Sequence, residues 1–151
     1  PNLKEFLEYA FNNFEQVCIF TASDKSCFDH VYEKSLKHIL PIDKKFYFVW
    51  CSERCTRPLY KNSELRDDFY TQPIKNLKVL KKVWRLYKAI NKHNTLIIDD
   101  TPETYRRNYG NAIPIITFKQ HMKDDKVLLD MIKLLNSLLP LESVRYTNKR
   151  I

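Results

Sequence analysis

Two adjacent carboxylates, Asp99 and Asp100, stand between a short apolar run and a turn that begins with threonine and proline. The run, residues 95–98, is too short for a helix and rich in residues favoured in strands, so it predicts a buried strand. The segment 101–103 (Thr-Pro-Glu) then has an N-cap candidate, a proline and an acid that suit the first turn of a helix. Carboxylates at the carboxyl end of a strand can hold a hard cation such as Mg²⁺. The alternative is that Asp100 or Thr101 caps the helix and that Asp99 is a solvated loop acid.

A second strand end carries a hydroxyl group. Residues 17–20 form a four-residue apolar run that predicts another strand, and Thr21 and Ala22 follow it directly. The Thr21 hydroxyl and the Ala22 amide can donate hydrogen bonds to phosphate oxygens. A loop lysine could neutralise the charge on those oxygens, and the two acids could hold the metal. Together these groups can bind a phosphoryl group, although Thr21 alone could equally be a strand-end or capping residue.

Helical and strand patterns alternate along the rest of the chain and must position these side chains. The spacing predicts helices over residues 2–14, 24–39, 76–90 and 124–139, and strands over residues 17–20, 46–50, 95–98 and 112–118. Pro114 suits an edge strand, and residues 51–74 predict a long loop. This alternation indicates an α/β fold with a mostly parallel sheet.

The composition excludes several classes of protein. The chain has 151 residues and 44% hydrophobic residues, which suits one globular domain. Its one glycine, Gly110, excludes a P-loop and a dinucleotide-binding fingerprint. No run approaches the roughly 18 apolar residues of a membrane span. Four cysteines without a disulfide-scaffold pattern favour a reducing compartment, and the spacing of Cys51 and Cys55 argues against zinc. A net charge of +8 favours polyanionic partners.

These motifs make the sequence similar to a known family. From residue 1 to about residue 140 the chain resembles the haloacid dehalogenase (HAD) superfamily. More narrowly, it resembles the NLI-interacting-factor-like phosphatases, which act on the carboxy-terminal domain (CTD) of RNA polymerase II. The matching segments are residues 1–7, 20–23, 75–77, 99–102 and 111–114.

The resemblance implies roles for single residues. Thr21, Ala22 and Lys75 would bind phosphate, with Thr21 and Lys75 acting as catalytic groups. Asp99 and Asp100 would hold Mg²⁺. Lys78 is the alternative to Lys75, because a long basic helix separates Lys75 from the acidic motif.

The family's nucleophile is absent from these residues. The family has an Asp-x-Asp motif on a central strand, between the strands that here end at Thr21 and Asp99, and the printed sequence contains no such motif. The pairs Asp67-Asp68 and Asp124-Asp125 have the wrong spacing. We expect a Rossmann-like HAD fold whose first, central strand lies upstream of Pro1 or is replaced by another strand, because unpaired edges inside a sheet are costly.

Two functions follow as expectations. One is a Mg²⁺-dependent protein serine/threonine phosphatase for an acidic phosphoprotein, with residues 1–151 inactive until an upstream Asp-x-Asp strand completes the site. The other is an inactive scaffold or binding subunit that contacts an acidic protein, RNA or a large assembly through the basic helix 76–90 and the tail. The domain would span residues 1–140, with residues 141–151 as a basic tail. The compartment would be the nucleus or cytoplasm, or the mitochondrion, where a relative serves in the inner-membrane import machinery.

Overall fold

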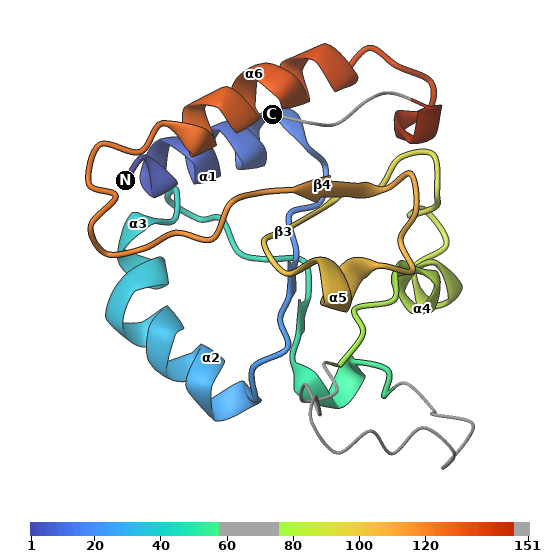
Figure 1. Ribbon diagram of the computed structural model, residues 1–151, viewed down its shortest axis with the longest axis horizontal. Helices are drawn as coiled ribbons and strands as arrows, with labels where there is room; N and C mark the ends of the chain where they lie inside the picture. Colours follow the sequence, from blue (N-terminus) through green and yellow to red (C-terminus); the bar gives the residue numbers. More distant parts are fainter. Residues whose placement is uncertain (58–75, 147–151) are drawn as a thin grey trace, which may run out of the picture.

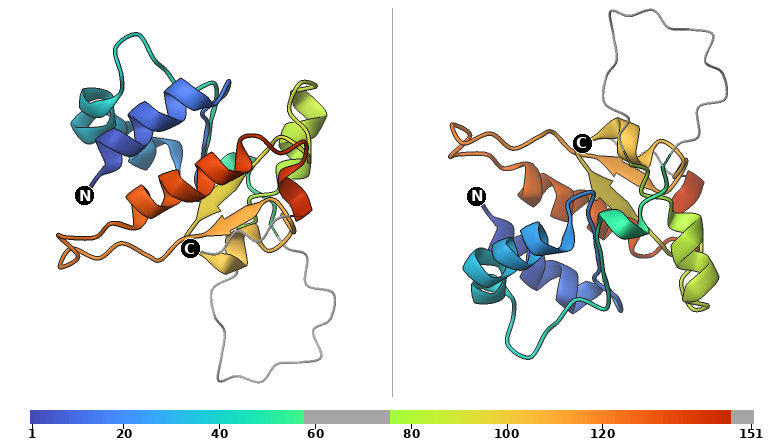
Figure 2. Two further views of the ribbon diagram at one scale, coloured as in Figure 1. Left: turned by 90° about the horizontal axis from the view of Figure 1, so that it is seen from above. Right: turned by 90° about the horizontal axis from the view of Figure 1, so that it is seen from below.

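Two small parallel sheets form the centre of the molecule, and helices surround them (Figures 1 and 2). The computed structural model describes residues 1–57 and 76–146. In one sheet, β1 (Ile19–Phe20) pairs with β2 (Val49–Trp50), and in the other, β3 (Ile97–Asp99) pairs with β4 (Ala112–Pro114). The expectation of an α/β fold with parallel strands is confirmed in this coarse form. The described strands form two separate sheets rather than one, and a strand that joins them stays a prediction.

The helices at the two ends of the described chain pack together. The helices α1 (Leu3–Asn13) and α6 (Val127–Leu138) lie side by side in Figure 1 and in the left view of Figure 2. Leu7 and Ala10 are buried on α1 because apolar residues recur there at helical spacing. Three buried side chains of α6 pack with Ile113 of β4 into one core cluster: Met131, Leu135 and Leu138.

The expected helix over residues 24–39 is present, but a π-helical turn interrupts its α-helical part. It runs as α2 (Lys25–Val31), a π-helical turn η1 (Tyr32–Leu36) and α3 (Lys37–Ile39). Asp24 caps its first turn, where its Oδ1 accepts a hydrogen bond of 2.7 Å from the Cys27 amide. The helix ends before Pro41, as the ring of proline requires.

The basic helix is shorter than the expected span of residues 76–90, which was wrong at both ends. The helix α4 covers only Leu80–Leu86. Leu77 cannot join it because its backbone amide and carbonyl both bond to Thr56 in an antiparallel bridge. The Leu80 amide donates a hydrogen bond to the side chain of Asn108, and the helix begins at Leu80.

A second core cluster connects the two sheets through α4. Trp50 of β2, Ile97 of β3, and Leu80 and Val83 of α4 pack together and are all buried. Ile97 of β3 belongs to this cluster and Phe20 of β1 packs against it. The carboxyl ends of these two strands lead into the segments that carry Thr21 and the acids. The helix α5 (Pro102–Tyr105) follows directly after β3.

The segment after α6 folds back onto the body of the molecule. In the turn η3 (Val144–Tyr146), the Val144 amide donates a 3.0 Å bond to the His93 carbonyl. Arg145 donates from Nη1 to Oδ1 of Asn111, which is fully buried. A boundary between domain and tail at residue 140 stays a prediction. None of the described helices is both long and apolar enough to cross a bilayer.

Candidate functional site

Asp99, the last residue of β3, is buried, and both oxygens of its carboxylate have hydrogen-bond partners. Only 6% of its surface is exposed. Its Oδ2 lies 2.5 Å from Nζ of Lys78 and accepts a 3.2 Å bond from the Thr104 hydroxyl, while its Oδ1 accepts a 2.9 Å bond from the Thr101 amide. The interpretation of Asp99 as a solvated loop acid is therefore wrong, because strand pairing and α5 enclose its carboxylate.

Backbone contacts hold Lys78 in place opposite Asp99. The Lys78 amide donates a 2.7 Å bond to the Thr104 carbonyl, and the Lys78 carbonyl accepts a 2.5 Å bond from Nδ2 of Asn108. Asn108 is 3% exposed, and its Oδ1 also accepts a 2.9 Å hydrogen bond from the Leu80 amide. One buried amide side chain thus fixes both Lys78 and the start of α4. The Lys78 side chain is 13% exposed and that of Asp99 only 3%, so this ion pair is largely shielded from water.

The loop after β1 is also tightly held. The Thr21 amide bonds to the Trp50 carbonyl at 2.8 Å, which extends the pairing of β1 with β2 by one residue. The Thr21 hydroxyl oxygen accepts a 3.1 Å bond from the Ser23 amide. Hydrogen bonds from the amide of Cys27 and the hydroxyl of Ser26 lower the pKa of Asp24 below its ordinary value of 3.8. The loop residues Ala22 and Ser23 are exposed, and the Ser23 carbonyl accepts a 2.8 Å bond from the Ser52 amide.

Cys55 connects the two halves of the site. Its Sγ lies 3.7 Å from the Thr21 carbonyl oxygen. Burial raises the pKa of the Cys55 thiol, and the nearby charges of Lys78 and Lys82 partly oppose that rise. The Lys82 ammonium group donates to the Arg54 carbonyl, next to Cys55 in the chain. Thr56, the residue after Cys55, pairs with Leu77, the residue before Lys78, so the backbone connects this thiol to both parts of the candidate site.

The structure brings some of the expected site residues together and leaves others apart. Thr21 and Asp99 occupy the carboxyl ends of β1 and β3, as expected from the strand pattern. Asp100 is exposed, and its contact is a 3.1 Å bond from the Thr101 hydroxyl. Lys75 lies outside the described residues. Lys78, the alternative to Lys75, is the described lysine that reaches Asp99.

Three further residues shape the site without a clear signal in the sequence. Thr104 and Asn108 are buried polar residues that bond to Asp99 and Lys78, and Cys55 bridges to Thr21. They lie in segments whose polar residues resemble ordinary loop residues. The one hint is that Thr104 stands five residues after Asp99, so the first turn of α5 returns its hydroxyl to the carboxylate.

The described residues do not by themselves fit a magnesium ion. No group of three His, Cys, Asp or Glu side chains that could hold a metal occurs within residues 1–57 and 76–146. Asp99 already neutralises the Lys78 ammonium group, and Asp100 contacts Thr101 at the surface. An octahedral hard cation needs more oxygen ligands than this pair offers, unless waters and further carboxylates complete the shell.

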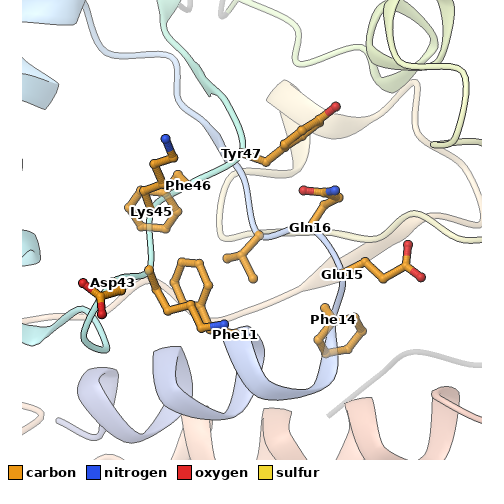
Figure 3. A pocket seen from close by; sticks show the side chains of 10 residues that line it. Phe11, Phe14, Glu15, Gln16, Asp43, Lys45, Phe46 and Tyr47 are labelled. Carbon is orange, nitrogen blue, oxygen red and sulfur yellow. The ribbon is translucent and has the colours of Figure 1, made fainter.

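A pocket of about 460 Å³ lies away from these residues, at the start of β1 rather than its end (Figure 3). It lies between the end of α1 and residues 43–47. Its lining is mixed, with the aromatic side chains of Phe11, Phe14 and Phe46 beside Glu15 and Lys45. No nucleophile paired with a base occurs among these lining residues, so the pocket is a weaker candidate for chemistry than the strand ends.

Comparisons with known proteins agree with this picture. A family model described as NLI interacting factor-like phosphatase matches residues 1–145. A CTD phosphatase-like protein of Invertebrate iridescent virus 6 is 29% identical over 120 residues, which are 78% of this chain and 60% of that protein. A protein of Dictyostelium discoideum named as a probable C-terminal domain small phosphatase is 28% identical over 145 residues, 96% of this chain and 39% of that protein. The matched part of the chain thus spans less than two thirds of either relative.

Proposed function

Because the chain belongs to the family of NLI interacting factor-like phosphatases, we propose that it forms the phosphate-binding part of a protein serine/threonine phosphatase domain. In this proposal the Thr21 hydroxyl and the Ala22 amide donate hydrogen bonds to phosphate oxygens of the substrate, while the Ser23 amide holds the Thr21 hydroxyl oxygen in place. Lys78 supplies the positive charge that stabilises those oxygens. The proposal assigns to Lys78 the role for which Lys75 was the first candidate.

The ion pair between Lys78 and Asp99 carries this proposal. A largely buried lysine is costly unless an anion compensates it, and Asp99 does so at 2.5 Å. A phosphoryl group that enters beside Thr21 would offer Lys78 a second anion without moving it far. Two contacts support this arrangement: Cys55 contacts the Thr21 carbonyl, and the neighbouring Thr56 pairs with Leu77, next to Lys78.

The proposal requires a nucleophile that the printed residues do not contain. The described part of the chain has parallel strands in two separate sheets, and β1 and β3 each bond to a partner on one side. We propose that a strand with an Asp-x-Asp motif pairs with both free edges. Its first aspartate would attack the phosphorus and its second would act as the general acid and base.

Binding of magnesium also requires the strand with the Asp-x-Asp motif. Asp99 would become one carboxylate ligand once the carboxylates of that strand lie beside it, with Asp100 as a further candidate. A bound Mg²⁺ would then neutralise charge on the phosphoryl oxygens. We further propose an intracellular, reducing compartment, because all four cysteines are free thiols in the described residues.

A binding role without catalysis is the second candidate. The observation in its favour is the absence of an Asp-x-Asp motif from all 151 residues. Without a nucleophile the same strand ends could still hold a phosphorylated partner, as a scaffold does. The two functions differ only in whether an aspartate is brought to the site.

Phosphate release from a phosphoserine peptide distinguishes the two functions. Residues 1–151 with Mg²⁺ are expected to release none, whereas the same chain with an Asp-x-Asp strand fused ahead of residue 1 should release phosphate. That activity should disappear when the first aspartate of the strand is changed to Asn, and in Asp99→Asn. Circular dichroism of each variant controls for folding. Release by residues 1–151 alone, or no release by a folded fusion, would contradict the proposed phosphatase mechanism.

A further inference from the structure

One segment beside the candidate site has charged residues of a single sign. Residues 76–98 contain no Asp or Glu, and their basic residues are Lys78, Lys81, Lys82, Arg85, Lys88 and Lys92. Within the described residues, the one ion pair among these six is that of Lys78 with Asp99. The remaining positive charges of this segment therefore have no compensating carboxylate in the described structure.

Three of these charges and one from the neighbouring turn form a continuous strip. We call Lys81, Lys82, Arg85 and Arg54 the α4 strip. Lys81 and Arg85 are exposed and stand one turn apart on α4. Lys82 reaches the Arg54 carbonyl, and the Arg54 guanidinium lies 5.4 Å from the centre of the Trp50 ring.

The strip begins at the candidate phosphate site. Lys82 bonds to the Arg54 carbonyl, next to Cys55, whose Sγ contacts the Thr21 carbonyl. Thr56, on the other side of Cys55, pairs with Leu77, next to Lys78. From Lys78 to Arg85 the backbone advances roughly 10–14 Å, given the rise of extended and helical residues. This is the length of three or four residues of an extended peptide.

We propose that the α4 strip binds acidic side chains that lie within about four residues of the phosphorylated residue of the substrate. The inference rests on the proposed function, since it assumes that the phosphoryl group binds at Thr21 and Lys78. Carboxylates there would meet uncompensated ammonium and guanidinium groups, whereas lysine or arginine in the same positions would be repelled. The strip thus selects among phosphoproteins by their local charge.

The aromatic side chains near the strip favour a peptide over RNA. Single-stranded nucleic acid is bound by exposed aromatic faces on which bases stack. Here Tyr87 stacks on Phe48 with ring centres 5.0 Å apart, and Trp84 donates its indole N–H to Thr95. These rings are partly buried in the core around Trp50, so the strip offers charge without a stacking platform.

Binding of three fluorescent phosphoserine peptides to residues 1–151 tests the inference. The peptides share one sequence and differ only in whether the flanking positions are acidic, neutral amide or basic, and each is also made without phosphate. We expect the acidic phosphopeptide to bind roughly tenfold more tightly than the neutral one, from three exposed ion pairs of ordinary strength. The triple variant Lys81→Gln, Lys82→Gln, Arg85→Gln should reduce that preference to less than about twofold.

A matched variant removes the same charge elsewhere. Lys34, Lys119 and Lys123 are exposed and belong to segments on the opposite side of the molecule from α4 (Figure 1). Their replacement by Gln should preserve the preference for acidic flanks. An equal loss in this control would show a general effect of net charge and would overturn the inference.

The remaining outcomes separate the inference from the proposed function. Equal affinity for acidic and neutral phosphopeptides, with phosphate still required, would overturn the role of the strip and leave the phosphate site supported. Acid preference without any effect of phosphate would instead overturn the proposed phosphate site. Tighter binding of a uridine octamer than of the acidic phosphopeptide, lost in the same triple variant, would assign the strip to RNA and overturn the inference.

Discussion

At the scale of single residues, Lys78 and Asp99 form an ion pair that is largely shielded from water. Each would be costly to bury alone, and each has hydrogen-bond partners besides the other: Thr101 and Thr104 for the carboxylate, and a backbone fixed by Asn108 for the lysine. Removing one partner leaves the other buried and uncompensated. Replacing both side chains by uncharged ones leaves no uncompensated charge buried.

A double-mutant cycle on this pair gives the first prediction. Lys78→Met should lower the free energy of unfolding by on the order of 3 kcal/mol, because it leaves the Asp99 carboxylate buried without a cation. The double variant Lys78→Met, Asp99→Asn should recover most of that loss. Urea denaturation followed by circular dichroism measures both.

The exposed pair of Lys133 with Asp130 is the matched control for this cycle, because both of its side chains are largely open to water. Lys133→Met should change the free energy of unfolding by less than about 1 kcal/mol. A cost at Lys78 no larger than this would show that the buried pair does not stabilise the site.

At the scale of elements, the loop from Thr21 to Asp24 depends on the helix that follows it. Asp24 bonds to the free amide of Cys27 and so ends the loop at a fixed point. The Ser52 amide bonds to the Ser23 carbonyl, which ties the loop to the start of η2 (Ser52–Arg54). The loop that carries the proposed phosphate-binding groups, the Thr21 hydroxyl and the Ala22 amide, is therefore positioned by two neighbouring elements.

The pH dependence of this cap gives a second prediction. The folded-state pKa of Asp24 is lowered below 3.8, so the stability that the charged cap contributes is present above that pH and is lost as the pH falls through the folded pKa. Asp24→Asn keeps a good capping side chain that does not titrate. Between about pH 6 and about pH 3, the Tm of the wild type should therefore fall more than that of Asp24→Asn. A difference in Tm that is constant across this range would show that Asp24 does not contribute in its charged form.

The sequence predicted elements better than it predicted their ends. The helices α1 and α6 follow clear apolar stripes, and their positions were expected to within a few residues. The basic helix was expected over 76–90 and covers Leu80–Leu86, because tertiary bonds to Thr56 and Asn108 decide where it starts. The expected strand over 112–118 pairs only over Ala112–Pro114. Strand length depends on the partner, which no local pattern contains.

In the candidate site, too, the sequence predicted positions along the chain better than contacts between distant residues. The strand pattern located Thr21 just after β1 and Asp99 at the end of β3, since apolar runs followed by polar residues mark carboxyl ends. That the two side chains face one phosphate site stays a prediction. The contacts of Thr104 and Asn108 could not be predicted, because their partners are distant in sequence or depend on the first turn of α5.

At the scale of the whole molecule, the described strands form two sheets that share a core around α4. In the described residues, β1 and β3 each pair with another strand along one edge only, and an unpaired edge readily accepts another strand. Completion by a strand that bears an Asp-x-Asp motif would join the sheets and place carboxylates between Thr21 and Asp99. The phosphatase and scaffold roles proposed for this chain both require that the carboxyl ends of β1 and β3 bind phosphate.

Titration of the ¹⁵N-labelled chain with inorganic phosphate, followed by amide chemical shifts, tests that phosphate site most directly. We predict that the largest shifts occur at Ala22 and Ser23 and around Lys78, and that they disappear in the double variant Lys78→Met, Asp99→Asn while Lys119→Gln leaves them unchanged. Shifts confined to the pocket between α1 and residues 43–47, or shifts at Ala22 and Ser23 that persist in the double variant, would contradict the account.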